Sequence, residues 1–392
     1  MGNQHEGVTA NQNNNRVMRW IPSSTLLLLL VLSACQPPKP PESTQTQPTP
    51  ITEKQAILED ATIENTSETG ELLWRVNAKN VIYSEDGKSA RFETITGNVL
   101  QNDELIVQLS ADRGEMVNDG EKMILHDNII VRDLRNGAIV RGKEMEWLTK
   151  ENLIIARDNF TGSHEELEVT AKEGRYFTLT QRLELKGKVI ATGTKNPMQM
   201  RTEEAVWELP AKKLTTKTKM QADRYDENKK ITDRILADKA EMNLETQVVV
   251  LQGNVRSNSV DPPVQVASDS IIWNMKGRSI LANKPVRIVH NTENTVINAN
   301  EGLINLKENV ARLKGGVRGI NASRQADLYA NEVVWAIDQR RIDAQGNIIY
   351  KQVNPPLEMT GTQAVGAIDL DRVTVTRGEN KRVVTQFVPN SF

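Results

Sequence analysis

The sequence predicts an all-β fold built from a stack of similar strand units. Three observations carry this prediction: a repeat of about 30 residues along most of the chain, alternation of apolar and polar residues within each repeat, and short polar turns between the alternating segments. Alternation makes one side of each strand polar, or wet, and the other side apolar, or dry. A sheet of such strands has to bury its dry side against another sheet.

The most regular feature of the repeat is a small residue followed, five positions later, by a large apolar or aromatic one. The small residues, which we call the anchors, recur at intervals of roughly 29 to 35 residues. The anchors are Ala78, Ala111, Gly142, Ala171, Thr202, Ala237, Ser268, Ala299, Ala330 and Gly361. The large residues, which we call the row, are Tyr83, Met116, Trp147, Tyr176, Trp207, Met242, Trp273, Ile304 and Trp335, and Gly366 takes this place in the last copy.

Polar interruptions between the alternating segments predict the turns. Asp86-Gly87, Asp119-Gly120 and Lys276-Gly277 each contain a glycine, which supplies the positive φ that a tight turn requires. Lys307-Glu308-Asn309 and Asp338-Gln339-Arg340 interrupt two matching copies. A stack of this kind has two ends with unpaired backbone groups, which can accept a strand from a neighbouring protein.

The amino-terminal segment predicts export. Arg16 and Arg19 precede an apolar run over residues 25–32, and Cys35 follows it, so we expect residues 1–34 to be a secretion signal with a lipobox. The run has about eight residues where a membrane-spanning helix needs roughly 20. Leu32-Ser33-Ala34-Cys35 resembles the bacterial lipobox, which implies that Cys35 is acylated and tethers the chain to a membrane. An ordinary signal with an incidental cysteine is the alternative.

The composition of the chain bears on its partners, its core and its covalent links. The chain has 392 residues and a net charge of −2 from 49 basic and 51 acidic residues spread along it, so nucleic acid is not an expected partner. Its 38% hydrophobic content suits a thin, elongated core. Cys35 is the only cysteine, which excludes an intramolecular disulfide and a cysteine-based metal site. The Pro-, Thr- and Gln-rich residues 35–55 predict an extended linker.

The dry side of the stack is the candidate binding site. The row mixes Trp, Tyr and Met with small residues in neighbouring layers, which leaves space, and Met adapts to irregular partners. We therefore expect the row to line an interior groove. Inner aliphatic residues complete the lining: Leu125, Ile129, Val189, Leu251, Val255 and Val317. The alternative is that the same residues are only the packed core of a β-sandwich or β-helix.

Recurring five-residue motifs resemble those of a known protein family. Leu185-Lys186-Gly187-Lys188-Val189, Leu251-Gln252-Gly253-Asn254-Val255 and Leu313-Lys314-Gly315-Gly316-Val317 resemble OstA-like repeats of lipopolysaccharide-export bridge proteins, most of all the LptC family. The resemblance covers Ala78 to about Val375 and implies an elongated twisted β-jellyroll, a V-shaped pair of antiparallel sheets built here from about ten repeats. Its interior would hold the acyl chains of lipopolysaccharide.

The resemblance also implies partners and a location. These are lipopolysaccharide, the LptF/LptG-like subunits of an inner-membrane ABC transporter, and an LptA-like bridge joined by edge strand addition. The location is the periplasm, at the inner membrane through acylated Cys35, with the outer membrane as an alternative. LptC-like proteins have about half as many repeats and a transmembrane helix, whereas this chain is longer. We therefore expect an LptC-like half over residues 56–235 and an OstA/LptA-like half over residues 236–392.

Catalysis finds little support in the sequence. The motifs for a nucleotide-binding loop, a serine nucleophile elbow and a histidine metal pair do not occur, and we expect no catalytic residue, metal or cofactor. His126 beside Asp127 is expected to be a solvated pair in a turn, and carboxylates near the anchors, such as Asp112 and Asp238, are expected to serve solubility. Two alternatives to a lipid carrier remain: a β-solenoid that acts on or binds polysaccharide, and a structural surface spacer.

Overall fold

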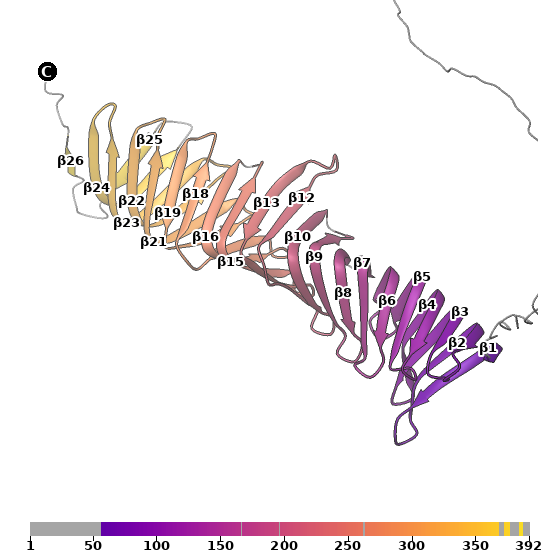
Figure 1. The fold of residues 1–392 in the computed structure, drawn as a ribbon. Coiled ribbons are helices and arrows are strands. Elements are labelled where there is room, and N and C mark those ends of the chain that lie inside the picture. The colour runs from indigo at the N-terminus through magenta and orange to yellow at the C-terminus, as the bar shows by residue number, and fades with distance from the viewer. Residues whose placement is uncertain are drawn as a thin grey trace, which may run out of the picture. The chain divides into compact units, whose positions relative to one another are not determined.

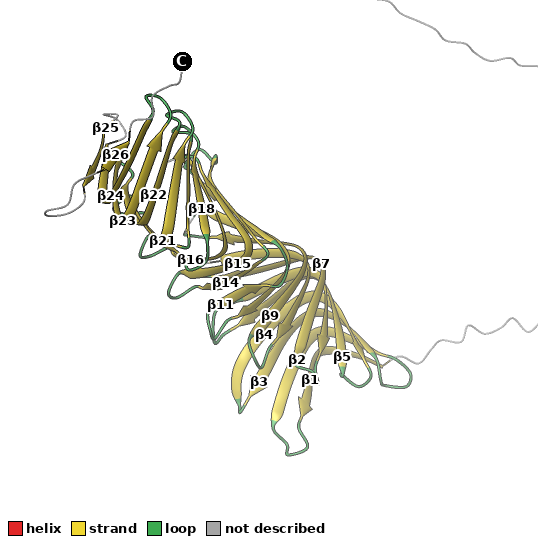
Figure 2. Ribbon diagram, turned by 90° about the vertical axis from the view of Figure 1, so that its left-hand side faces the viewer, coloured by secondary structure: helices red, strands yellow, loops and turns green. Residues whose placement is uncertain are grey.

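The computed structural model describes residues 56–165, 167–195, 197–261, 263–367, 372–376 and 384–386, and Cys35 with the predicted signal and linker lies outside them. Every regular element within these residues is a β-strand, and loops join the strands (Figure 2). The strands up to the middle of the stack are β1 (Ala56–Thr66), β2 (Leu72–Tyr83), β3 (Ala90–Gln101), β4 (Glu104–Val117), β5 (Lys122–Asp133), β6 (Ile139–Leu148), β7 (Leu153–His164), β8 (Leu167–Phe177), β9 (Arg182–Gly193), β10 (Met198–Glu208), β11 (Lys213–Thr216), β12 (Met220–Tyr225) and β13 (Ile231–Ala237). The others are β14 (Lys239–Asn243), β15 (Val248–Ser259), β16 (Val264–Asn274), β17 (Ser279–Ala282), β18 (Val286–His290), β19 (Thr295–Ala299), β20 (Glu301–Asn305), β21 (Val310–Asn321), β22 (Ala326–Ala336), β23 (Arg341–Gln352), β24 (Leu357–Ala367), β25 (Arg372–Thr376) and β26 (Val384–Gln386).

The strands form one antiparallel ladder that follows the chain. From β1 to β10 each strand pairs with the next one. Figure 1 shows the strands stacked in chain order, from indigo at β1 to yellow at β26. The predicted all-β, elongated β-jellyroll made of stacked repeats is confirmed.

Each long strand contributes to two leaves of this sheet. The second half of β16 pairs with β17 through Trp273, and its first half pairs with β18 through Ser268. β10 is divided in the same way between β11 and β12. One leaf therefore contains the row and is called the tryptophan leaf, and the other contains the anchors and is called the anchor leaf.

Six long strands pass from one leaf to the other at a two-residue bulge. In β15 the pairing with β16 skips from Gln252 to Val255, and the unpaired Gly253 and Asn254 have φ angles of 74° and 47°. Glycine, Asn and Asp occupy this left-handed region at the lowest cost. Similar pairs are Asp127-Asn128, Asp158-Asn159, Gly187-Lys188, Gly315-Gly316 and Gly346-Asn347. The recurring sequence motifs therefore lie where the strands cross from one leaf to the other, and we call this line of crossings the corner.

Polar residues beside the anchors hold this corner. Asp112 accepts a hydrogen bond from the Asn128 side-chain amide at 2.7 Å, and Asp238 accepts one from the Asn254 amide at 2.7 Å. Turn and edge solubility was the role expected of these two carboxylates, and each one in addition fixes a bulge residue on the neighbouring strand.

Two predicted turns differ from the structure. Gly87 and Gly120 have the expected positive φ, but at Lys276-Gly277 the left-handed residue is Arg278, one position later. Arg278 lies directly before β17, as Gln247 lies directly before β15. The position within the repeat, and not the presence of a glycine, therefore decides which residue is left-handed. His126 and Asp127 do not lie in a turn either, since both belong to β5 and Asp127 is the first bulge residue.

The buried core follows the dry side of both leaves. It falls into two clusters of buried residues, one running from Trp74 to Leu244 and the other from Met220 to Val375. Met200 and Met242 pack against both clusters, so the dry interior continues between them. The boundary between halves at residue 235 stays a prediction.

We expect Gly174→Ala to destabilise the protein by about 1 to 3 kcal/mol, because a methyl group there overpacks the core. A Cβ at Gly174 would lie 2.2 Å from the Phe160 ring. Gly319→Ala is the matched control, since its nearest heavy atom would be 3.9 Å away. Urea denaturation measures both, and equal midpoints for the two variants would show that the Phe160 ring moves aside freely.

Candidate functional site

The nine row residues lie side by side across the tryptophan leaf. Each one is separated from the next by a single strand, whose directly opposed residue completes the line. Trp147 pairs with Ile154 and Ile154 pairs with Tyr176, for example, and Trp273 pairs with Ile280 and Ile280 with Ile304. The residues between row members were missed by the sequence analysis: Ala90, Met123, Ile154, Leu183, Leu214, Val249, Ile280 and Ala311. Their spacing in the sequence is the same repeat and could have identified them.

The six predicted aliphatic residues also lie on the inner side, on both sides of the corner. All six are buried, with exposed fractions of 2% or less. Leu125 and Leu251 belong to the tryptophan leaf, where they pair with Met145 and Ile271. The other four belong to the anchor leaf directly after a bulge, where each pairs with an anchor: Ile129 with Gly142, Val189 with Thr202, Val255 with Ser268, and Val317 with Ala330.

The row is packed tightly from Met116 to Trp207, whereas its first member, Tyr83, is only partly buried. Met116, Trp147, Tyr176 and Trp207 are at most 5% exposed. Trp147 meets Trp74 edge to face, with 5.8 Å between the ring centroids. In this stretch the structure fits the packed-core alternative, whereas Met242, Trp273 and Ile304 further along are only partly buried.

Three cavities lined mainly by apolar side chains follow one another from the middle of the interior toward the carboxy terminus. The first has about 200 Å³ and reaches from Leu167 to Met275, the second has about 230 Å³, and the third, with about 130 Å³, lies between Ile297 and Val373. Trp273 lines both the first and second cavities, and Trp335 lines both the second and third. Apolar cavities of ~150 Å³ stay dry and can bind small apolar molecules.

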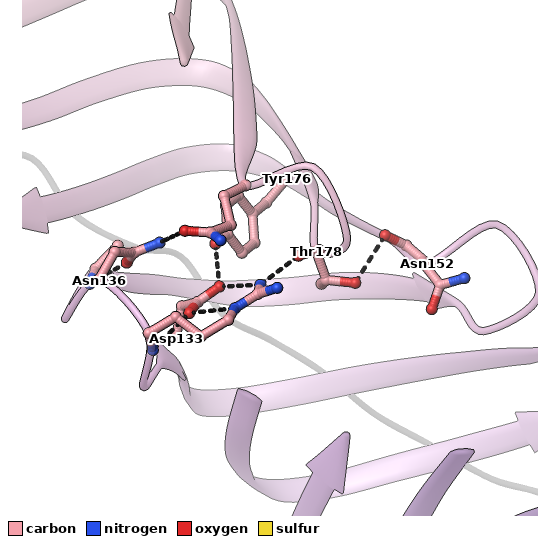
Figure 3. A network of polar contacts seen from close by, with 8 residues as sticks. Asp133, Asn136, Asn152, Tyr176 and Thr178 are labelled. Atoms are coloured by element: carbon pink, nitrogen blue, oxygen red, sulfur yellow. Dashed lines mark hydrogen bonds and ion pairs between the residues drawn. The ribbon is translucent and has the colours of Figure 1, made fainter. Parts of the chain in front are cut away.

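The open edge between the leaves, opposite the corner, is called the mouth, and a polar network crosses it near β5 and β8 (Figure 3). The Tyr176 hydroxyl donates to Asp133, Arg135 donates to Asp133 at 2.6 Å and to the carbonyl of Thr178, and Asn136 donates to Gln181 at 2.8 Å. Asp133 is 1% exposed. Burial raises the pKa of the Tyr176 hydroxyl, as does the bond to Asp133, so the phenol stays a proton donor at neutral pH.

Two histidines take the same place as Asp133 in other repeats. The His164 ring meets Trp207 at 5.6 Å between centroids, and the His290 ring meets Trp335 at 5.9 Å. Arg340 also forms an ion pair with Glu293 across the mouth. His164 Nδ1 and Trp335 Nε1 are buried without a hydrogen-bond partner among the described residues.

The described residues offer nothing that a metal or a membrane-spanning helix would need. No three His, Cys, Asp or Glu side chains gather there in a way that could hold a metal ion. The same residues contain no helix of the length and apolarity that would cross a membrane. The site these residues form is an apolar interior with a polar edge, which can exclude water from hydrocarbon.

Comparison with known proteins gives a family match over most of the chain. The family described as lipopolysaccharide-assembly, LptC-related, matches residues 25–159, 141–224 and 205–322. Curated proteins yield no match. Among solved structures, LptH, described as the LptA homologous periplasmic component of the lipopolysaccharide transport device from Pseudomonas aeruginosa, is 14% identical, with 40% of this chain and 95% of that chain covered and a TM-score of 0.20. AztD from Citrobacter koseri is 8% identical over 75% of this chain and 94% of that chain, with a TM-score of 0.11.

We expect Asp133→Asn to destabilise the protein by on the order of 2 kcal/mol, because it leaves the half-buried Arg135 without its carboxylate. Tyr176→Phe removes one hydrogen bond and keeps the ion pair, so about 1 kcal/mol is expected. Chemical denaturation of both variants checks the order. A smaller loss for Asp133→Asn than for Tyr176→Phe would contradict a network centred on Asp133.

Proposed function

The chain belongs to the family of lipopolysaccharide-assembly, LptC-related proteins, and from this premise we propose that it is a non-enzymatic component of the lipopolysaccharide transport bridge. It receives lipopolysaccharide from an inner-membrane ABC transporter with LptF/LptG-like subunits. It then passes the lipid along its apolar interior toward the outer membrane. The observation that supports this proposal best is the series of apolar cavities that share Trp273 and Trp335.

The driving force for binding is the removal of acyl chains from water. Each buried methylene contributes ~0.8 kcal/mol, so one chain of about a dozen carbons gains on the order of 10 kcal/mol. Each interior cavity is smaller than the ~300 Å³ of an ordinary ligand pocket. A lipid with several chains therefore has to occupy the cavities together, with the shared Trp273 and Trp335 side chains moving aside.

Transport further requires that neighbouring sites be nearly equal, so that no position traps the cargo. The repeat supplies this property, because a row residue recurs at every second strand of the tryptophan leaf, or every ~9.6 Å at ~4.8 Å per strand. The tight packing around Trp147 and Trp207 favours a spacer role for the amino-terminal half, or a groove that opens only when lipid arrives. The row residues remain our candidates for lipid contact.

Partners are proposed at the ends of the stack and at the membrane. Among the described strands β1 pairs only with β2, which leaves its other edge for a strand from the transporter or from an LptA-like bridge protein. Cys35, once acylated, holds the chain at the inner membrane on its periplasmic side. More than one acyl chain is required there, because a single chain binds a membrane only weakly.

We expect a photo-crosslinking residue at Trp273 to capture lipopolysaccharide in cells, because Trp273 lies between two interior cavities. The same residue at Arg312, which is exposed on the outside of β21, is the matched control and should capture none. Capture at Arg312 without capture at Trp273 would rule out an interior route.

We expect Cys35→Ser to move the protein from the membrane fraction to the soluble fraction, because the acyl anchor can no longer form. Immunoblotting of fractionated cells measures the shift. Retention of the variant in the membrane would mean that another contact anchors the chain.

A further inference from the structure

Among the residues that the structure describes, side-chain contacts join the two leaves across the mouth in two stretches of the chain, and a cavity opens to the surface between them. Toward the amino terminus the Asp133 network and the contact between His164 and Trp207 join the two leaves. Toward the carboxy terminus the leaves are joined by His290 against Trp335 and by the ion pair between Glu293 and Arg340. In each of these contacts, the residue on the anchor leaf comes about one and a half repeats earlier in the chain than its partner on the tryptophan leaf. The contacts therefore occupy equivalent places in different repeats.

A fourth cavity, the mouth cavity, lies between these closed stretches. It has about 700 Å³ and is lined from the anchor leaf by Met198, Tyr225 and Val260, and from the tryptophan leaf by Gln247, Trp273 and Met275. Val260 is 66% exposed, so the cavity reaches the surface. Met198, Trp273 and Met275 also line the first interior cavity, which therefore continues into the mouth cavity.

The exposure of the row changes at the same place. Trp207 and Trp335, which lie under the closed stretches, are 2% and 3% exposed. The three row members between them, Met242, Trp273 and Ile304, are only partly buried. The cavity and the partly buried row members beside it thus locate one opening in the mouth.

The rim of the opening suits a ligand that is polar on one side and apolar on the other. Tyr225, Asp226, Gln247 and Asp261 provide hydroxyl, carboxylate and amide groups, which hydrogen-bond sugar hydroxyls. Met198 and Met275 are flexible and adapt to acyl chains of different shape. We propose that the mouth cavity is a lateral port, through which the acyl chains of a glycolipid enter the interior while its hydroxyl-rich head stays at the rim. This inference rests on the proposed function.

A crosslink across the port tests this inference on the folded full-length chain. Asp226→Cys with Gln247→Cys joins the two rims of the port by a bismaleimide, and Asn136→Cys with Gln181→Cys joins the rims of a closed stretch, where those side chains are already 2.8 Å apart. The probe is purified lipopolysaccharide, and the readout is the lipid that remains with the protein after gel filtration. The parent chain treated with the same reagent controls for Cys35.

We expect the port crosslink, made before lipid is added, to lower bound lipopolysaccharide at least about tenfold, and the control crosslink to change it by less than about twofold. Equal loading with and without the port crosslink overturns the port and leaves the proposed function standing. An equal block by both crosslinks also overturns it, because loading would then need the whole mouth to open. If the parent chain itself retains no lipopolysaccharide, the proposed function fails and the port fails with it.

A second measurement avoids any crosslink between the leaves. Gln181 and Gln247 occupy the same turn position of the tryptophan leaf, with φ angles of 52° and 55°. Gln181 is held by Asn136 across the closed mouth, whereas Gln247 borders the port. A photo-crosslinking residue at position 247 should capture the glycan part of lipopolysaccharide, and the same residue at position 181 should not. Equal capture at both positions contradicts a port.

Discussion

Two consecutive left-handed residues in the middle of a long strand are the constraint on which the fold depends. A strand of this length has one dry side, and a flat sheet of such strands would leave that side in water. The bulge at Gly253-Asn254 and its counterparts turn β5, β7, β9, β15, β21 and β23 so that the two halves of each belong to facing leaves. The two bulge residues face a single residue of β16, and Leu251 before them and Val255 after them both lie on the dry side. The Asp and Asn residues beside the anchors fix this geometry from the neighbouring strand.

The size of each inner side chain follows from its distance to the corner. The anchors lie next to the bulge, where the leaves are joined, and only small residues such as Ala299 and Ala330 fit there between their larger partners. The row lies further out along the tryptophan leaf, where Trp and Met reach into the space between the leaves. This gradient from small to large makes an interior that is dry near the corner and can vary in width toward the mouth.

The mouth gives the interior its polar side. Asp133, His164 and His290 end their strands at equivalent positions and meet Tyr176, Trp207 and Trp335 on the opposite leaf. Such contacts close the interior to water where they occur. Between these contacts, where Met198 and Met275 line the mouth, the first apolar cavity continues to the surface. A lipid carrier needs both kinds of stretch, since hydrocarbon has to be enclosed and a bulky polar head has to remain in solvent.

The sequence by itself determined the strands, the repeat, the inward side and the row, because alternation with period two and a repeat of about 30 residues are local properties of the chain. The sequence shows Gly253-Asn254 as part of a repeated motif, but it does not show that these residues form the corner. A bulge is defined by the residues of the neighbouring strand that it leaves unpaired, and these are known only from the structure. The bond of Asp112 was missed and His126 was misread for the same reason: the neighbours that explain them lie on other strands. The contact of His290 with Trp335, the three cavities and the opening between the closed stretches were decided only by the tertiary structure. They depend on residues one and a half repeats apart that meet across the interior, and no local pattern shows whether the space between them is filled.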